Sequence, residues 1–398
     1  MKYKFPKDFL WGVSSSAYQT EGNGSNTDWW FHETHKKHTD KYPEEPSGIA
    51  NDFWNRYEED INLVSELGCN SFRISVEWAR IEPTEGTFDE EAIFHYKKIL
   101  EYAKSKNLKI FLTIHHFTIP LWFREKGGFE SLSAANYFSR YALKVVEEFN
   151  DYVDFYITIN EMEVLTLMGY IRGSWAPMKK NNLLALWVHI NLLNCHNKAY
   201  KTIKKKYSAK IGLVKNIVWY EGKGDSLLDK LNARVAFFVN SHLSLMPVSR
   251  NLDFIGLNYY FSNLIRNFIV CNPCDPESDL GWWISFDGLR NTLVSLRRYN
   301  KDIYITENGL ADAEDEKRSW FIKNMLITAH EALDANDVRV KGYFHWTLTD
   351  NYEWHHGYWP QFGLVKIDRK DNLKRIKRKS FDYYKMICKT GIIEDTIN

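Results

Sequence analysis

Eight short apolar segments, rich in β-branched and aromatic residues, alternate with longer amphipathic stretches along the chain. The expected strands are Phe9–Ser15, Ser71–Val76, Lys109–His115, Phe155–Asn160, Lys210–Val214, Asp253–Asn258, Asp302–Thr306 and Val340–Trp346. The expected helices between them include Phe53–Leu67, Glu90–Lys106, Ala134–Asp151, Leu183–Tyr207, Asp225–Leu245, Phe286–Tyr299 and Asp315–Asn336. Strands that alternate with helices form βαβ units around a mostly parallel sheet.

Eight such units predict an α/β fold, a single (β/α)8 TIM barrel spanning residues 1–398 as one catalytic domain. An open, doubly wound sheet is the structural alternative. No GxGxxG or GxxxxGK[ST] pattern follows the first expected strand, which is evidence against that alternative.

The composition bounds the classes of partner. Of the 398 residues, 44% are hydrophobic and 26% are charged, and the net charge is only +1. A balanced charge creates no positive electrostatic field that would attract nucleic acid or an anionic membrane, so we expect neither as a partner. The first residues contain no apolar leader segment. The odd count of five cysteines suggests free thiols in a reducing compartment. We therefore predict a cytoplasmic protein.

Polar, charged and aromatic residues follow the apolar segments at one end. In a (β/α)8 barrel the carboxyl ends of the strands form the active-site face. Two of these residues, Glu161 and Glu307, each end an apolar run beside an asparagine. An enzyme that cleaves glycosidic bonds needs two carboxyl groups that face each other across a pocket. We therefore expect the closed fold to bring these two glutamates together.

The motifs resemble those of family 1 glycoside hydrolases, of the β-glucosidase/β-galactosidase type, and especially its compact archaeal-like members. The resemblance extends over nearly the whole chain. Its motifs are Phe9–Gly12, Tyr18–Gly22, Arg73–Trp78, Thr113–Phe117, Asn160–Glu161, Asn258–Tyr260, Ile305–Gly309, Asp350–Trp354 and Phe362–Val365. Together, in this order, they are highly specific.

The resemblance implies a retaining double displacement, with Glu307 as the nucleophile and Glu161 as the general acid/base. The nucleophile must be ionised, and the resemblance implies that Arg73 and Tyr259 support it with a positive charge and a hydrogen bond. The acid must carry a proton at working pH, so burial and the charge of Glu307 should raise the pKa of Glu161.

The resemblance also implies the residues that bind the sugar, which are Gln19, His115, Asn160, Trp346, Glu353 and Trp354. In phosphosugar-specific relatives, a serine stands in the region where this chain has Trp354. The resemblance therefore favours an unphosphorylated sugar as the substrate. The expected partner is a small carbohydrate, a β-D-glucoside, with β-galactosides and β-fucosides as side substrates. No metal and no cofactor is expected.

Several features depart from the family pattern. Met162 follows Glu161 where the family usually has proline, and the chain is shorter between the fourth and seventh expected strands. The aglycone preference and homo-oligomer formation are therefore open. Two alternative functions also remain, a transglycosylase of the same family and a catalytically silent sugar-binding scaffold. The silent scaffold is disfavoured because such relatives usually lose one of the two glutamates.

Overall fold

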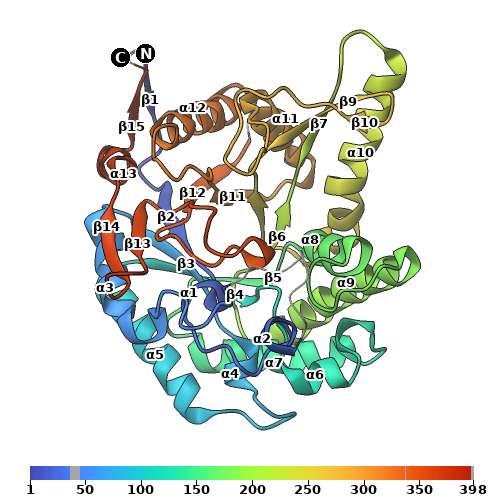
Figure 1. Ribbon diagram of the computed structural model, residues 1–398, viewed down its shortest axis with the longest axis vertical. Helices are drawn as coiled ribbons and strands as arrows, with labels where there is room; N and C mark the ends of the chain where they lie inside the picture. Colours follow the sequence, from blue (N-terminus) through green and yellow to red (C-terminus); the bar gives the residue numbers. More distant parts are fainter. Residues whose placement is uncertain (36–44, 337, 396–398) are drawn as a thin grey trace.

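Eight parallel strands close into a barrel at the centre of the molecule, shown by a computed structural model that describes residues 1–35, 45–336 and 338–395 (Figure 1). In chain order they are β2 (Leu10–Ser14), β3 (Ser71–Ser75), β4 (Lys109–His115), β5 (Phe155–Asn160), β6 (Ile211–Asn216), β8 (Phe254–Asn258), β11 (Asp302–Asn308) and β12 (Val340–Trp346). The pairing of β12 with β2 closes the sheet. The predicted barrel is confirmed, and the open-sheet alternative is wrong.

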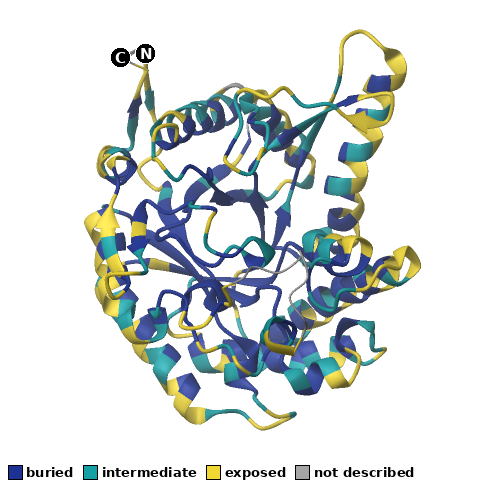
Figure 2. Ribbon diagram, viewed as in Figure 1, coloured by how far each residue is buried: buried dark blue, intermediate teal, exposed yellow. Residues whose placement is uncertain are grey.

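The large helices form a ring outside the barrel (Figure 1). They are α3 (Phe53–Glu66), α5 (Glu90–Ser105), α7 (Ala134–Phe149), α9 (Asn182–Lys204), α10 (Leu227–Leu245), α11 (Phe286–Leu296), α12 (Arg318–Asn336) and α13 (Lys379–Thr390). Figure 2 shows the strands buried and most helices exposed along their outer faces. This pattern follows from the sequence, because apolar side chains recur at helical spacing on the faces that cover the strands.

An aromatic cluster fills part of the barrel interior. Its buried members are Phe111, Phe155, Ile157, Val214, Phe254, Tyr304 and Phe344. Phe111 and Phe155 stack with their ring centroids 4.2 Å apart. None of these side chains is the last residue of its strand, so the cluster leaves the carboxyl ends for polar residues.

Short elements complete the fold. The short helices are α1 (Ala17–Thr20), α2 (Asp28–His35), α4 (Trp78–Ile81), α6 (Leu121–Glu125), α8 (Met162–Thr166), η1 (Gly128–Glu130), η2 (Leu167–Arg172), η3 (Met246–Asn251), η4 (Arg297–Tyr299) and η5 (Trp354–His356). Outside the barrel, strands β7 (Trp219–Gly222), β9 (Ser262–Arg266) and β10 (Ile269–Val270) form one sheet. Two antiparallel pairs join β13 (Val365–Asp368) to β14 (Lys374–Lys377) and β1 (Lys2–Lys4) to β15 (Ile392–Glu394). The last pair brings the two ends of the chain together (Figure 1).

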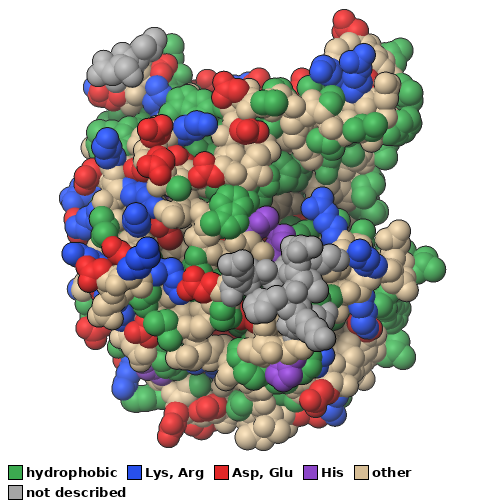
Figure 3. Space-filling view, viewed as in Figure 1, with side chains coloured by type: hydrophobic (Ala, Val, Ile, Leu, Met, Phe, Trp, Pro, Cys, Tyr) green, Lys and Arg blue, Asp and Glu red, His purple; other side chains and the backbone are tan. Residues whose placement is uncertain are grey.

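Helix α10 carries an exposed apolar face. Leu231, Val235, Val239 and Leu243 are each more than half exposed, and hydrophobic side chains gather along this helix at the right of Figure 3. No helix in the described part of the chain is both long enough and apolar enough to span a bilayer.

Candidate active site

Glu161 lies at the junction between β5 and α8, at the carboxyl end of the barrel. Its backbone adopts the left-handed conformation, with φ 46° and ψ 58°. The carboxylate atom Oε1 accepts hydrogen bonds from Nδ2 of Asn258 at 2.6 Å and from Nδ2 of Asn216 at 3.0 Å. The side chain is buried, and both of these hydrogen-bond donors are neutral amides.

Glu307 lies in β11 and has different partners. Its carboxylate forms a buried ion pair with the Arg73 guanidinium, which comes from β3. The hydroxyl of Tyr260 donates to the other carboxylate oxygen at 2.6 Å. A cation and a charge-assisted hydrogen bond both favour the ionised form of a carboxyl group.

The expected contact of Tyr259 with Glu307 is wrong. The Tyr259 hydroxyl lies 2.8 Å from Oγ of Ser262 and donates to the backbone oxygen of Ser285 at 2.7 Å. Successive residues of an extended chain point to opposite sides. Because Asn258 points into the mouth, Tyr260 points there too, and Tyr259 points away.

The expected position of His115 in the sugar site is also wrong. The His115 ring packs edge-on against Phe129 and Phe138, with centroid distances of 5.0 and 6.2 Å. The neighbouring His116 lies at the site instead, with its Nε2 atom 3.3 Å from Nδ2 of Asn160. Strand β4 ends at His115, and the backbone of Phe117 has a positive φ of 74°, so the alternation of the strand does not continue.

Asn160 joins the two halves of the site. Its Oδ1 atom accepts from Nη2 of Arg73 at 2.7 Å and from Nδ2 of Asn258 at 3.3 Å. The amide of Gln19, from α1, donates to the Tyr352 backbone oxygen at 2.9 Å and to Oδ1 of Asn351 at 3.2 Å. These two bonds fix Gln19 against the segment that carries Glu353.

Aromatic rings border the site. The rings of Trp346 and Trp354 are each nearly parallel to that of His116, with centroids 6.3 Å away. Both tryptophans are almost fully buried. Trp354 also packs against Phe117 at 5.1 Å and Trp175 at 5.2 Å. Flat apolar rings beside polar groups suit the C–H faces and hydroxyls of a sugar.

Burial shifts the protonation of the acidic groups. Burial, and then the negative charge of Glu307, raise the pKa of Glu161 well above its usual range. The same two causes raise the pKa of Glu353 to about 8. Burial, and then the Arg73 charge, hold the pKa of His116 well below its usual value. These shifts favour the protonated forms of Glu161 and Glu353 and the neutral form of His116.

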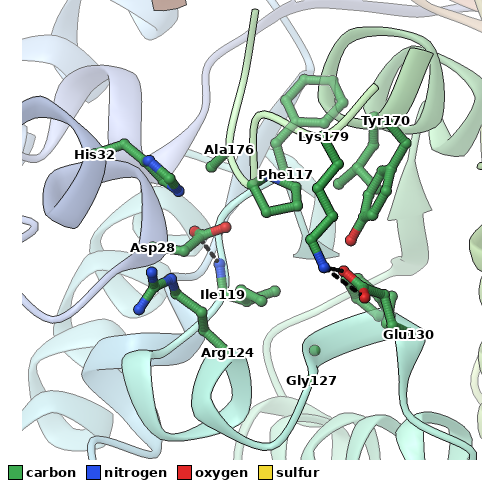
Figure 4. A pocket seen from close by; sticks show the side chains of 14 residues that line it. Asp28, His32, Phe117, Ile119, Arg124, Gly127, Glu130, Tyr170, Ala176 and Lys179 are labelled. Atoms are coloured by element: carbon green, nitrogen blue, oxygen red, sulfur yellow. Dashed lines mark hydrogen bonds and ion pairs between the residues drawn. The ribbon is translucent and has the colours of Figure 1, made fainter. Parts of the chain in front are cut away.

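A cavity of about 320 Å³ lies beside this site (Figure 4). Its walls include Asp28, Phe117, Glu130, Tyr170 and Lys179. Lys179 and Glu130 form an ion pair at 2.6 Å across one side. Phe117 separates the cavity from Trp354, and none of the expected site residues lines it.

Four residues at the site had no role assigned from the sequence, namely Asn216, which lies outside the motifs, and Asn258, His116 and Tyr260, which lie within them. Two of them carried a usable signal. Phe254 lies in the barrel interior, so alternation along β8 would have assigned Asn258 and Tyr260 to the same side. Across residues 1–35, 45–336 and 338–395, no group of three or more His, Cys, Asp and Glu side chains is arranged to hold a metal ion.

Comparison with known proteins places this geometry in a family. The model of glycosyl hydrolase family 1 matches residues 1–245 and 236–392. A 1,4-β-D-glucan glucohydrolase of Thermotoga neapolitana is 30% identical over 98% of this chain and 100% of its own length. The β-glycosidase from Pyrococcus horikoshii superposes with a TM-score of 0.92, at 34% identity over 99% of this chain and 97% of that one.

A third comparison bears on assembly. A β-glucosidase mutant described as derived from a hyperthermophilic tetrameric structure superposes with a TM-score of 0.91, at 27% identity over 98% of this chain and 97% of that one. Since the family model spans the barrel and the relatives match it from end to end, this chain belongs to glycosyl hydrolase family 1.

Proposed function

We propose that this glycoside hydrolase is a retaining β-glycosidase that hydrolyses unphosphorylated β-D-glucosides, with Glu307 as the nucleophile and Glu161 as the general acid/base. One observation carries the proposal. Two buried carboxyl groups meet at the barrel mouth, one bound by a guanidinium and a phenol and the other by neutral amides. The family resemblance implies the same pair of roles.

The first chemical step uses both groups. The ionised Glu307 attacks the anomeric carbon, while the protonated Glu161 donates its proton to the departing glycosidic oxygen. Formation of the glycosyl ester removes the negative charge of Glu307. Because that charge raises the pKa of Glu161, its loss makes Glu161 more acidic. Glu161 then accepts a proton from water, whose oxygen attacks the anomeric carbon, displaces the Glu307 carboxylate and restores the original anomeric configuration.

The sugar site is proposed from the groups around these carboxyls. Gln19 and Glu353 would bind sugar hydroxyls, Asn160 would donate to the 2-hydroxyl, and Trp346 would stack on the sugar face. His116 takes the place first expected for His115. Trp354 leaves an apolar wall rather than a phosphate-binding group, which supports neutral glucosides, with β-galactosides and β-fucosides as side substrates.

We also propose that residues 1–398 act as one catalytic domain, since β12 pairs with β2 and the terminal strands β1 and β15 pair with each other. A cytoplasmic location is supported by the five cysteines, none of which forms a disulfide.

The Glu307→Ala variant should fold and lose more than about 10⁴-fold in kcat on an aryl β-glucoside, because no group remains to form the glycosyl ester. Added azide should restore turnover by entering the vacated space and giving the α-glycosyl azide. Nuclear magnetic resonance of the product identifies the anomer. Normal turnover by this variant without azide would show that another residue is the nucleophile.

The Glu161→Ala variant should lose roughly 10²- to 10⁴-fold in kcat/KM on phenyl β-glucoside, whose leaving group needs a proton. The loss should be much smaller on 2,4-dinitrophenyl β-glucoside, because that leaving group departs as a stable anion. Steady-state kinetics on the two substrates measures the difference. An equal loss on both would contradict the role of Glu161 as the acid.

The Tyr260→Phe variant should lower kcat/KM about 10- to 100-fold, since it removes a hydrogen bond to a charged group worth about 1.5–3 kcal/mol. The matched Tyr259→Phe variant removes a buried hydroxyl that does not contact Glu307, so its activity loss should be much smaller. Kinetics on one aryl β-glucoside compares them. The reverse order would restore Tyr259 as the supporting residue.

We also propose that the chain forms a homo-oligomer through the exposed apolar face of α10. One solved relative is described as derived from a tetramer, and four apolar side chains on this face are more than half exposed. Light scattering should therefore give more than one chain's mass. Leu231→Glu should dissociate the assembly, whereas Leu132→Glu, at an exposed position outside α10, should not. A single-chain mass for the unmodified protein would exclude the assembly.

A further inference from the structure

A second carboxyl group lies two residues beyond Glu161, and the proposed mechanism does not use it. Glu163 belongs to the first turn of α8. One of its oxygens accepts the backbone N–H of Asn216 at 2.5 Å, and the other forms an ion pair with Nζ of Lys215 at 2.8 Å. The Lys215 side chain is fully buried, so its ammonium needs this partner.

Lys215 and Asn216 are consecutive residues at the end of β6, and their side chains point to opposite sides. The Asn216 amide points into the barrel mouth and donates to Glu161. Lys215 points to the helix layer. Burial, and then the Lys215 charge, lower the pKa of His189 in α9. Burial, then the Arg298 charge and then the Lys215 charge lower the pKa of His242 in α10. Glu163 thus contacts the backbone of the residue that binds Glu161 and the cation behind it.

The left-handed backbone of Glu161 explains the importance of the contact between Glu163 and the Asn216 N–H. A left-handed conformation is unfavourable for a residue with a side chain and persists only where the surroundings impose it. Strand β6 imposes it from two positions. The N–H of Glu161 donates to the Val214 oxygen at 3.0 Å, and the side chain of Glu163 receives the N–H of Asn216.

We propose that the Glu163–Lys215 pair is a positioning unit for the acid/base residue, which holds Glu161 against Asn216 and balances the charge beside it. The inference rests on the proposed role of Glu161. Glu163 clamps the start of α8 to the end of β6. Lys215 neutralises Glu163, so that the clamp adds no net charge beside the acid.

The charged and titratable groups around the Glu163–Lys215 pair determine in which direction each substitution should shift the pKa of Glu161. Burial raises the pKa of Glu161 most, and the negative charges of Glu307 from β11 and of Glu163 from α8 raise it further. Its amide partners are Asn258 and Asn216. Lys215 forms its ion pair with Glu163, and His189 and His242 lie near it in the helix layer. Both histidines have pKa values lowered to about 4. Near neutral pH these histidines carry no charge.

The alkaline limb of the pH profile of kcat/KM reports the loss of the proton from Glu161. Removing one charge of the pair at a time should therefore move this limb in opposite directions. Glu163→Gln leaves the Lys215 cation, which favours the Glu161 carboxylate, so the limb should move to lower pH. Lys215→Met leaves the Glu163 anion, which favours the protonated acid, so the limb should move to higher pH. We expect each shift to be at least about 0.5 pH unit. The double variant Glu163→Gln/Lys215→Met should return close to the original profile.

A second comparison separates positioning from charge. Glutamine at position 163 keeps an acceptor for the Asn216 N–H, whereas alanine removes it. Glu163→Ala should therefore lose about tenfold or more in kcat/KM on phenyl β-glucoside, beyond the loss in Glu163→Gln, and less than about threefold on 2,4-dinitrophenyl β-glucoside. A purely structural role would lower kcat/KM equally on both substrates.

Folding controls accompany these measurements. A buried charge without its partner is destabilising, so circular dichroism melting is recorded for each variant. If a single variant does not fold, Glu163→Ala/Lys215→Met removes both charges and the acceptor, and it should show the same leaving-group dependence. Glu331→Gln, which breaks the half-exposed ion pair with Arg290, is the matched control and should change neither readout.

Two outcomes would overturn the proposal. These are shifts of the pH limb that are absent or of the same sign in the two single variants, and an equal loss on both substrates for the alanine variants. Glu161→Ala is assayed in parallel. If Glu161→Ala shows the leaving-group dependence and the Glu163 variants do not, only the positioning role fails. If Glu161→Ala itself lacks that dependence, the proposed acid is wrong.

Discussion

The guanidinium of Arg73 is the interaction on which the barrel mouth depends. From β3 it reaches Thr113 on β4 at 3.2 Å, Asn160 on β5 at 2.7 Å, and Glu307 with the Thr306 backbone oxygen on β11. A fully buried cation is costly unless its hydrogen bonds are satisfied. The carboxyl ends of these four strands must therefore come together in one arrangement, and that arrangement brings Glu161 and Glu307 to the same mouth.

The two glutamates differ in their proposed roles because their partners differ. Glu307 receives a cation and a phenol, and both favour its ionised form. Glu161 receives two neutral amides in a buried setting, and the nearby charge of Glu307 keeps its proton in place. This is the separation of acid and nucleophile that a double displacement needs. In the proposed mechanism the charge of Glu307 favours the protonated form of Glu161, so the loss of that charge in the intermediate would convert the acid into a base.

Strand irregularities at the mouth help to aim these side chains. The pairing of β5 with β6 shifts register between Ile157 and Asn160, and the pairing of β11 with β8 shifts between Ile305 and Glu307. Register shifts redirect side chains that regular alternation would send to the other side. The left-handed backbone of Glu161 follows directly after the first shift, where Glu163 and β6 hold the chain.

The sequence by itself determined the eight strands, the helices between them and the two glutamates at strand ends, because apolar periodicity is a local property. Only the tertiary structure decided which of two adjacent side chains enters the mouth. His115 and His116 differ because β4 ends between them, and the next turns of the chain depend on packing with other loops. The pairing of Glu163 with Lys215 also depends on tertiary structure, since it joins elements that are distant in sequence and become neighbours only when the barrel closes.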